Sequence, residues 1–273
     1  MNSVSINPAH LLTTLWQHRQ LIWQMSKREV VSRYRGSVMG LMWSFFHPVF
    51  MLTIYTFVFS VVFQAKWGQG HSENRAEFAI ILFAGLIVFN LFSEVVNRAP
   101  GLILSHVNYV KKVVFPLEIL PVVVLGAALF HALISTLVLL FFSAVLTHSL
   151  PVTILLLPFV LLPLLVLVLG VGWFLASLGV FLRDVGQTVS ILTTALLFLS
   201  PIFFPISALP ESLHIYLFLN PLAFIIEQTR SVLIWGEGPN WGGLLLCFIV
   251  NALVAWGGLA WFQKTRKGFA DVL

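Results

Sequence analysis

The side chains with the capacity for chemistry are a few ionisable residues that lie in or beside long apolar runs. Glu94 and Arg98 are four residues apart, and Glu227 and Arg230 are three apart, so each pair falls on one helix face. Charges at the centre of a bilayer are unfavourable and must face protein, water or head groups. We expect a structural ion pair in each case. A proton relay is disfavoured because the apolar runs 152–182 and 241–262 contain no acid.

Catalytic and metal-binding motifs are missing from the sequence. It has no phosphate-binding GxxxxGK[ST] run, no HExxH and no GxSxG turn, and none of its eight histidines forms an i, i+4 pair. The single cysteine, Cys247, has no partner for an internal disulfide. We therefore expect no enzymatic activity, no metal and no cofactor in this chain. Any energy source must lie in a separate protein.

The composition indicates an all-α integral membrane protein. Of 273 residues, 59% are apolar and 9% are charged, against roughly 25% charged in soluble domains. The run 37–63 has one histidine and no Asp, Glu, Lys or Arg, and it exceeds the roughly 20 residues that cross a bilayer. The chain has room for one membrane domain, 37–273, behind a segment 1–36. We expect membrane lipids and no nucleic acid among its partners.

Apolar runs separated by polar, proline or glycine breaks predict six transmembrane helices. Counted with both ends inside, twelve Lys and Arg residues lie on the inner side and three on the outer side. This asymmetry predicts a multi-pass protein with both termini in the cytoplasm. The predicted spans are about 37–64, 77–98, 118–147, 152–181, 187–204 and 241–262.

Residues 1–36 predict an amphipathic interfacial helix on the cytoplasmic side. From Pro8 to Arg35 the apolar residues recur near helical spacing, with glutamine and basic residues between them. Without an early apolar core, the segment does not read as a cleaved signal peptide. An orientation anchor and a contact with substrate or partner are both open.

The segment 205–235 predicts a re-entrant helical hairpin between the fifth and sixth spans, on the periplasmic side. It is apolar, yet Pro205, Pro210 and Pro221 rule out one straight spanning helix. Asn220 followed by Pro221 predicts a helix start. Broken backbone at membrane depth is tolerated where protein or water surrounds it, so we expect a gate.

Two further features allow a plain and a functional interpretation. Aromatic residues crowd the first and fifth spans, where they contact lipid and neighbouring helices or form a path on which sugar rings stack: Trp43, Phe46, Phe50, Tyr55, Phe198, Phe203 and Phe204. The loop 100–116 predicts a short helix ending at Lys111 and Lys112. These lysines satisfy the positive-inside rule or serve docking to a motor subunit.

Several segments in fixed order resemble the membrane subunit of ABC-2 type polysaccharide exporters, with the O-antigen and related lipopolysaccharide export permeases as the most similar subfamily. They run from about Ser26 to the C-terminus: RYRGSVMGLMWSFFHPVFMLTIYTFVF, FAGLIVFNLFSE, NYVKKVVFPLEILP, FLRDV, FLSPIFFPISALPE, NPLAFIIEQTR and KGFADVL. His47 departs from the family, in which asparagine is common before the proline.

The resemblance implies a homodimer in the bacterial inner membrane, working with two separate ATP-binding cassette subunits that hold ATP and Mg. The transported substrate would be undecaprenyl-diphosphate-linked polysaccharide, moved from cytoplasm to periplasm. The same resemblance implies a site near the lipid head groups that binds the diphosphate, formed by Arg33, Tyr34 and Arg35. It also implies a coupling helix that contains Asn108, Tyr109, Lys111 and Lys112. The periplasmic gate would contain Pro205, Pro221, Glu227 and Arg230.

Two alternatives remain open at this point. One is an ABC-2 permease for another substrate, such as capsule, a teichoic-acid-like polymer, a small lipid, an ion or a drug. The other is a membrane-embedded glycosyl- or acyltransferase, which would need a cluster of acids or a catalytic histidine at the interface. Activity of the purified chain without any ATPase would favour the transferase.

Overall fold

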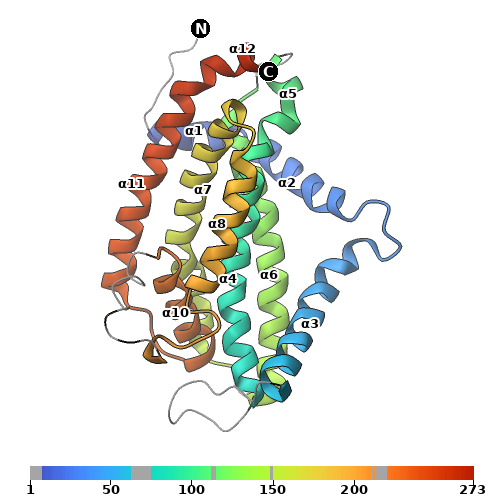
Figure 1. Ribbon diagram of the computed structural model, residues 1–273, viewed down its shortest axis with the longest axis vertical. Helices are drawn as coiled ribbons and strands as arrows, with labels where there is room; N and C mark the ends of the chain where they lie inside the picture. Colours follow the sequence, from blue (N-terminus) through green and yellow to red (C-terminus); the bar gives the residue numbers. More distant parts are fainter. Residues whose placement is uncertain are drawn as a thin grey trace.

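The computed structural model describes residues 8–62, 75–111, 115–147, 150–208, 210, 212 and 220–273, which contain helices and no strand. Figure 1 shows these helices as an elongated bundle. Short 3-10 and π segments extend or join several of them. The α-helices are α1 Pro8–Gln17, α2 Arg19–Arg33, α3 Trp43–Tyr55, α4 Arg75–Leu102, α5 Val107–Lys111, α6 Leu120–Thr147, α7 Leu157–Phe181, α8 Val185–Leu199, α10 Ala223–Arg230, α11 Trp241–Thr265 and α12 Phe269–Val272.

Five helical stretches in the described residues are long and apolar enough to cross a membrane. They agree with five of the predicted spans and confirm a multi-pass, all-helical integral membrane protein. Their bounds are Gly40–Phe59, Glu77–Leu102, Leu117–Leu146, Val152–Phe181 and Trp241–Val272.

The remaining predicted span, 187–204, is shorter in the structure. Helix α8 covers 15 residues and ends before Ser200, whose backbone is extended. A residue before proline is disfavoured in the α conformation, and Pro201 follows. The helix is about 22 Å long, less than the roughly 30 Å of a hydrocarbon core.

Helix α4 lies at the centre of the bundle. It contacts α6, α7, α8 and α10, and Figure 1 shows it between α6 and α8. Of its most apolar stretch, 83% is buried within the protein, against 17% for the first span. Polar residues on this helix therefore face protein or a cavity rather than lipid.

Helices α7 and α11 pack closely because glycine removes the side chains between them. A Cβ atom on Gly258 would overlap the Gly170 carbonyl, and one on Gly170 would overlap the backbone of Ala255. Asn251 of α11 adds a hydrogen bond from Nδ2 to the Pro163 carbonyl, at 3.0 Å. This contact fixes α11 on the outside of α7.

The N-terminal segment forms two helices, α1 and α2, with a break at His18. Helix α2 packs on α6, where the Ser26 hydroxyl donates to the Val123 carbonyl at 3.1 Å. Gly126 makes room, because a Cβ there would lie 2.5 Å from Ser26 Oγ. Trp23 is 72% exposed. One side of α2 is thus bound to protein, and Trp23 remains available to lipid. The location of α2 at the membrane interface stays a prediction.

The chain after α8 is broken, as its prolines predict. It includes a 3-10 turn at Ile206–Ala208, α10 and a π turn at Ser231–Trp235, while 209, 211 and 213–219 lie outside the described residues. The expected helix start at Asn220 is wrong by a few residues. Asn220 Oδ1 instead accepts from the Leu222 amide at 2.9 Å, and α10 begins at Ala223.

Arg230 holds this broken segment to the bundle. Its side chain is fully buried; Nη1 donates to Glu227 at 2.6 Å, Nε to the Ile81 carbonyl at 3.1 Å and Nη2 to the Ile202 carbonyl at 3.1 Å. The predicted ion pair with Glu227 is confirmed. Arg230 also joins α10 to α4 and to the residues after α8.

The predicted short helix in 100–116 is present as α5, and the C-terminus lies against the same region. The Tyr109 ring stacks on Phe115 with centroids 4.4 Å apart. Arg266 donates to Glu118 at 2.7 Å and to the Phe115 carbonyl at 2.9 Å. Residues before α6 therefore connect α5 to the end of the chain.

Candidate functional site

A cavity of about 820 Å³ lies between the end of α2, the loop after it, and helices α3, α4 and α6. This volume is typical of a small-molecule site. Its lining residues are Arg33, Tyr34, Ser37, Trp43, Ser44, His47, Pro48, Met51, Tyr55, Phe83, Ile87, Asn90, Leu91, Ser93, Glu94, Asn97, Arg98, Ala128, His131, Ala132 and Ser135.

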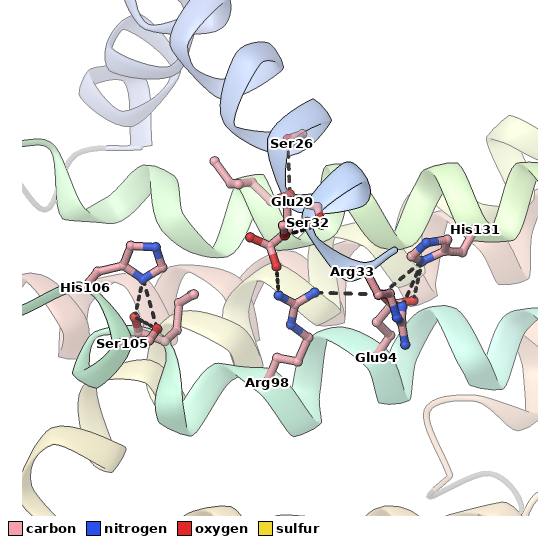
Figure 2. Close-up of polar contacts among 11 residues, drawn as sticks. Ser26, Glu29, Ser32, Arg33, Glu94, Arg98, Ser105, His106 and His131 are labelled. Atoms are coloured by element: carbon pink, nitrogen blue, oxygen red, sulfur yellow. Dashed lines mark hydrogen bonds and ion pairs between the residues drawn. The ribbon is translucent and has the colours of Figure 1, made fainter. Parts of the chain in front are cut away.

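Four of these side chains form a polar cluster that joins three elements. Arg33 Nη1 donates to Glu94 at 2.7 Å, and His131 Nδ1 lies 3.0 Å from both Glu94 oxygens. The Tyr34 hydroxyl lies 3.2 Å from His131 Nε2. Figure 2 shows Arg33 and His131 converging on Glu94. The cluster fixes the end of α2 against α4 and α6.

The proton positions in this cluster follow from Tyr34. Burial raises the pKa of Tyr34, opposed by the charge of Arg33 and reinforced by that of Glu94. The phenol therefore keeps its proton and donates to His131 Nε2. Because Nε2 accepts this hydrogen bond, we assign the single N–H of the neutral imidazole to Nδ1, where it is donated to Glu94.

A second ion pair lies beside the cluster. Arg98 of α4 pairs with Glu29 of α2, and Arg98 Nη1 is 3.9 Å from Glu94, which confirms the predicted Glu94–Arg98 pair. Figure 2 shows Arg98 reaching from α4 toward Glu29. Two acids and two arginines thus link α2 and α4.

The guanidinium of Arg33 keeps one edge available. Its side chain is 53% exposed, and within the described residues its polar contacts, with Glu94 and His131, all run through Nη1. The Nε and Nη2 nitrogens form the fork that binds carboxylate or phosphate with two parallel hydrogen bonds. The cavity mouth can therefore bind an anion without releasing Glu94.

Three cavity residues on α4 were not singled out from the sequence. Asn90, Ser93 and Asn97 lie on the same face as Glu94 and Arg98, because their spacings are three, four, seven and eight. This polar stripe in an apolar span was the signal available. The stripe was missed because only the charged residues of this span were considered.

The structure brings together some of the expected head-group and aromatic residues. Arg33, Tyr34, Trp43 and Tyr55 line the cavity. Arg35 is exposed and lies outside the lining. Of the two arginines expected to bind the diphosphate, Arg33 therefore lines the cavity and Arg35 does not.

The other expected aromatics lie elsewhere. Phe46 and Phe50 stack on each other at 6.1 Å, and Phe50 is 54% exposed. Phe203 stacks on Phe198 at 5.8 Å and on Phe59 at 6.0 Å. Phe204 is half-buried and, like Phe46, Phe50, Phe198 and Phe203, does not line the cavity.

The expected coupling and gate residues are separate from the cavity. Asn108 and Lys111 are exposed on α5, while Lys112 lies outside the described residues. Pro205 is half-buried and Pro221 exposed, on either side of the part of the hairpin that is not described. In the described ranges no three His, Cys, Asp or Glu side chains are grouped to hold a metal.

Comparison with known proteins decides the family. Residues 20–234, from α2 to the π turn after α10, match the family described as ABC-2 type transporter. The chain belongs to this family. The matched range contains every residue of the cavity.

Individual ABC-2 relatives match over nearly their whole length. The O-antigen export system permease protein RfbA of Myxococcus xanthus is 27% identical over 263 residues, 96% of this chain and 98% of the relative. The protein of the same name from Klebsiella pneumoniae is 23% identical over 91% of this chain and 93% of its own length. The polysialic acid transport protein KpsM of Escherichia coli is 26% identical, covering 88% of this chain and 91% of the relative.

Proposed function

We propose that this chain is the permease subunit of an ATP-driven exporter that moves an undecaprenyl-diphosphate-linked, O-antigen-like polysaccharide from cytoplasm to periplasm. The carrying observation is a cavity with Arg33 at its edge in a chain that O-antigen export permeases match over more than nine-tenths of its length. The family match accounts for the membrane domain. The relatives' names supply the class of substrate.

The diphosphate of the lipid carrier binds at Arg33 in this proposal. The free Nε and Nη2 edge of its guanidinium suits a phosphate, and the hydrogen bond from Tyr34 to His131 holds the end of α2 in place beside it. Trp43 and Tyr55 offer ring faces to the sugar rings that follow. The remaining aromatics, outside this cavity, serve lipid contacts or a later part of the path.

The working assembly in this proposal is a homodimer with two separate ATP-binding cassette subunits in the bacterial inner membrane. Both termini face the cytoplasm, α8 with the residues after it forms the fifth of six spans, and the broken segment 205–235 is a periplasmic gate. Support comes from the excess of Lys and Arg on the inner side of the predicted topology and from helix α5, which exposes Asn108 and Lys111 and suits docking to a motor.

A second polymer class is favoured by one comparison. The polysialic acid transport protein resembles this chain about as closely as the O-antigen permeases do. A capsule-like polymer is therefore the alternative cargo. The same permease function applies in that case.

Deletion of the gene in its host tests the function. Lipid extracts and surface glycan are analysed together, and the wild-type and Arg33→Ala genes are reintroduced. We expect polymer on undecaprenyl diphosphate to accumulate inside, and only the wild-type gene to restore surface glycan. Loss of the polymer altogether would indicate a role in synthesis, and unchanged surface glycan would contradict the proposal.

A further inference from the structure

The exposed residues of α4 are the starting observation. Across 77–100, a range the structure describes in full, Asn90 and Asn97 are the exposed residues and every other side chain is buried or half-buried. Both amides line the cavity. They are seven residues apart, which places them on one helix face about 10 Å apart along the axis. An apolar, central span thus presents carboxamides into a cavity.

These amides have hydrogen-bonding groups to spare. Asn97 Oδ1 accepts a hydrogen bond from the Thr193 hydroxyl of α8 at 2.9 Å. In the described part of the chain, the Nδ2 group of Asn97 donates no hydrogen bond to protein. The Asn90 side chain makes no hydrogen bond to the described residues. Unsatisfied amides at membrane depth are unfavourable unless water or a ligand meets them. A side-chain amide offers both a donor and an acceptor, as a sugar hydroxyl does.

The opposite wall supplies an aromatic face and a second polar group. Phe59, after α3, stacks on Phe78 at the start of α4, with ring centroids 5.4 Å apart. Trp43 and His47 of α3 line the same cavity as Asn90 and Glu94 of α4. The α3 side of the cavity therefore carries an indole ring and an imidazole.

We propose that Asn90 and Asn97 form a subsite for the first sugar of the lipid-linked glycan, next to the diphosphate at Arg33. This inference rests on the proposed function and adds a contact that distinguishes glycans. The amides bind neutral hydroxyl or acetamido groups, while the sugar's C–H face lies against Trp43. No charged side chain is needed at this position, which suits an uncharged first sugar.

The test compares two lipids on one preparation. The permease, in complex with its ATP-binding subunits in lipid nanodiscs, is titrated with undecaprenyl diphosphate and with undecaprenyl diphosphate bearing one glucose, galactose or N-acetylglucosamine. We expect at least one sugar-bearing lipid to bind more tightly than the bare lipid. Asn90→Ala and Asn97→Ala should each reduce this preference about three- to tenfold and leave bare-lipid binding unchanged.

Matched variants separate the subsite from packing. Thr193→Val removes the Asn97 contact with α8 but keeps the amide, and Thr194→Val removes an exposed hydroxyl of α8 outside the cavity. Both should keep the wild-type preference. If Thr193→Val reproduces the Asn97→Ala effect, the role of Asn97 is packing and its place in the subsite is overturned.

Two failures are distinguishable. If the wild type binds bare and sugar-bearing lipids equally, or if Asn90→Ala and Asn97→Ala retain the preference, the subsite is overturned and the proposed function stands. If the wild type binds none of these lipids, the proposed function fails together with the subsite. A parallel Arg33→Ala variant should weaken binding of bare and sugar-bearing lipids by the same factor.

Discussion

Arg33 Nη1 and Glu94 Oε1 lie 2.7 Å apart, although 61 residues separate them in the sequence. The contact closes one edge of the cavity by joining α2 to α4. Because the Arg33 side chain is 53% exposed, water screens the pair, and exposed pairs typically contribute only about 0.2–1 kcal/mol to stability. The contact is better explained by orientation of the guanidinium than by stabilisation of the fold.

Arg33→Ala should therefore impair export much more than folding. Loss of a charge-assisted hydrogen bond to diphosphate should weaken lipid binding by about 10- to 100-fold, equivalent to about 1.5–3 kcal/mol. Arg35→Ala is the matched control, since Arg35 is exposed outside the cavity, and should lose less. Surface glycan in complemented deletion strains and thermal unfolding of the purified variants provide the two readouts. Normal export by Arg33→Ala would remove the head-group role.

Arg230→Met should destabilise the whole bundle. It removes at least three hydrogen bonds from a fully buried guanidinium and leaves Glu227 without this partner, a loss of about 3–5 kcal/mol. Lys264→Met, at an exposed position of α11, is the control. Thermal unfolding in detergent measures both variants. Equal midpoints for the two would mean that Arg230 does not hold the segment in place.

Gly258→Ala should loosen α11 from α7, because its new methyl group would overlap the Gly170 carbonyl. We expect a destabilisation of about 1–3 kcal/mol from the enforced backbone shift. The matched control is Gly257→Ala at the neighbouring position, since nothing lies within 4 Å of a Cβ atom there. It should be neutral or slightly stabilising, since alanine favours helix. If both variants unfold at the same temperature in detergent, Gly258 is not required for the packing of α11 on α7.

Tyr109→Ala should weaken the connection between α5 and the residues before α6. The ring contact with Phe115, at 4.4 Å, is typical of aromatic pairs worth about 0.5–1.5 kcal/mol. If α5 couples to the ATPase, export should fall about two- to tenfold while the assembled complex still hydrolyses ATP. Tyr109→Phe keeps the stacking and should export normally. Equal export by the alanine and phenylalanine variants would argue against transmission through this contact.

The Tyr34 cluster should respond to alkaline pH. Burial raises the pKa of Tyr34, so the folded protein favours the neutral phenol. The associated stability is present below the unfolded pKa, about 10, and is lost as pH rises beyond it. Thermal unfolding of the wild type and Tyr34→Phe should differ by a constant amount from pH 7 to 9. Above about pH 10 the difference should move against the wild type, and a difference that stays constant to pH 11 would contradict the assignment.

Sequence periodicity predicted the parts of the fold that depend on bilayer thickness and local spacing. Five spans, the helix after Leu102 and the pairs Glu94–Arg98 and Glu227–Arg230 follow from runs and intervals of fewer than about 30 residues. The cavity did not follow, since it depends on contacts such as Arg33 with His131, 98 residues apart. Nothing in the interval between two such residues reports that tertiary packing will bring them together.

The length of α8 was missed for a different reason. Its apolar run continues through Phe203 and Phe204, and hydropathy alone does not register that Ser200 precedes a proline. The amides of α4 were missed because uncharged polar residues contribute weakly to a search for buried charge. Their common helix face identifies them once the direction of the cavity is known.

Helix α4 is held at two distant points, so that it can tilt as one rigid body. Arg230 binds the Ile81 carbonyl near one end, and the other end leads past Arg98 to the short helix α5. The stretch from Ile81 to Arg98 is about 25 Å long, so a tilt of about 5° would displace one end by about 2 Å relative to the other. A push on α5 would therefore reach Arg230 and the broken segment without any helix having to unfold.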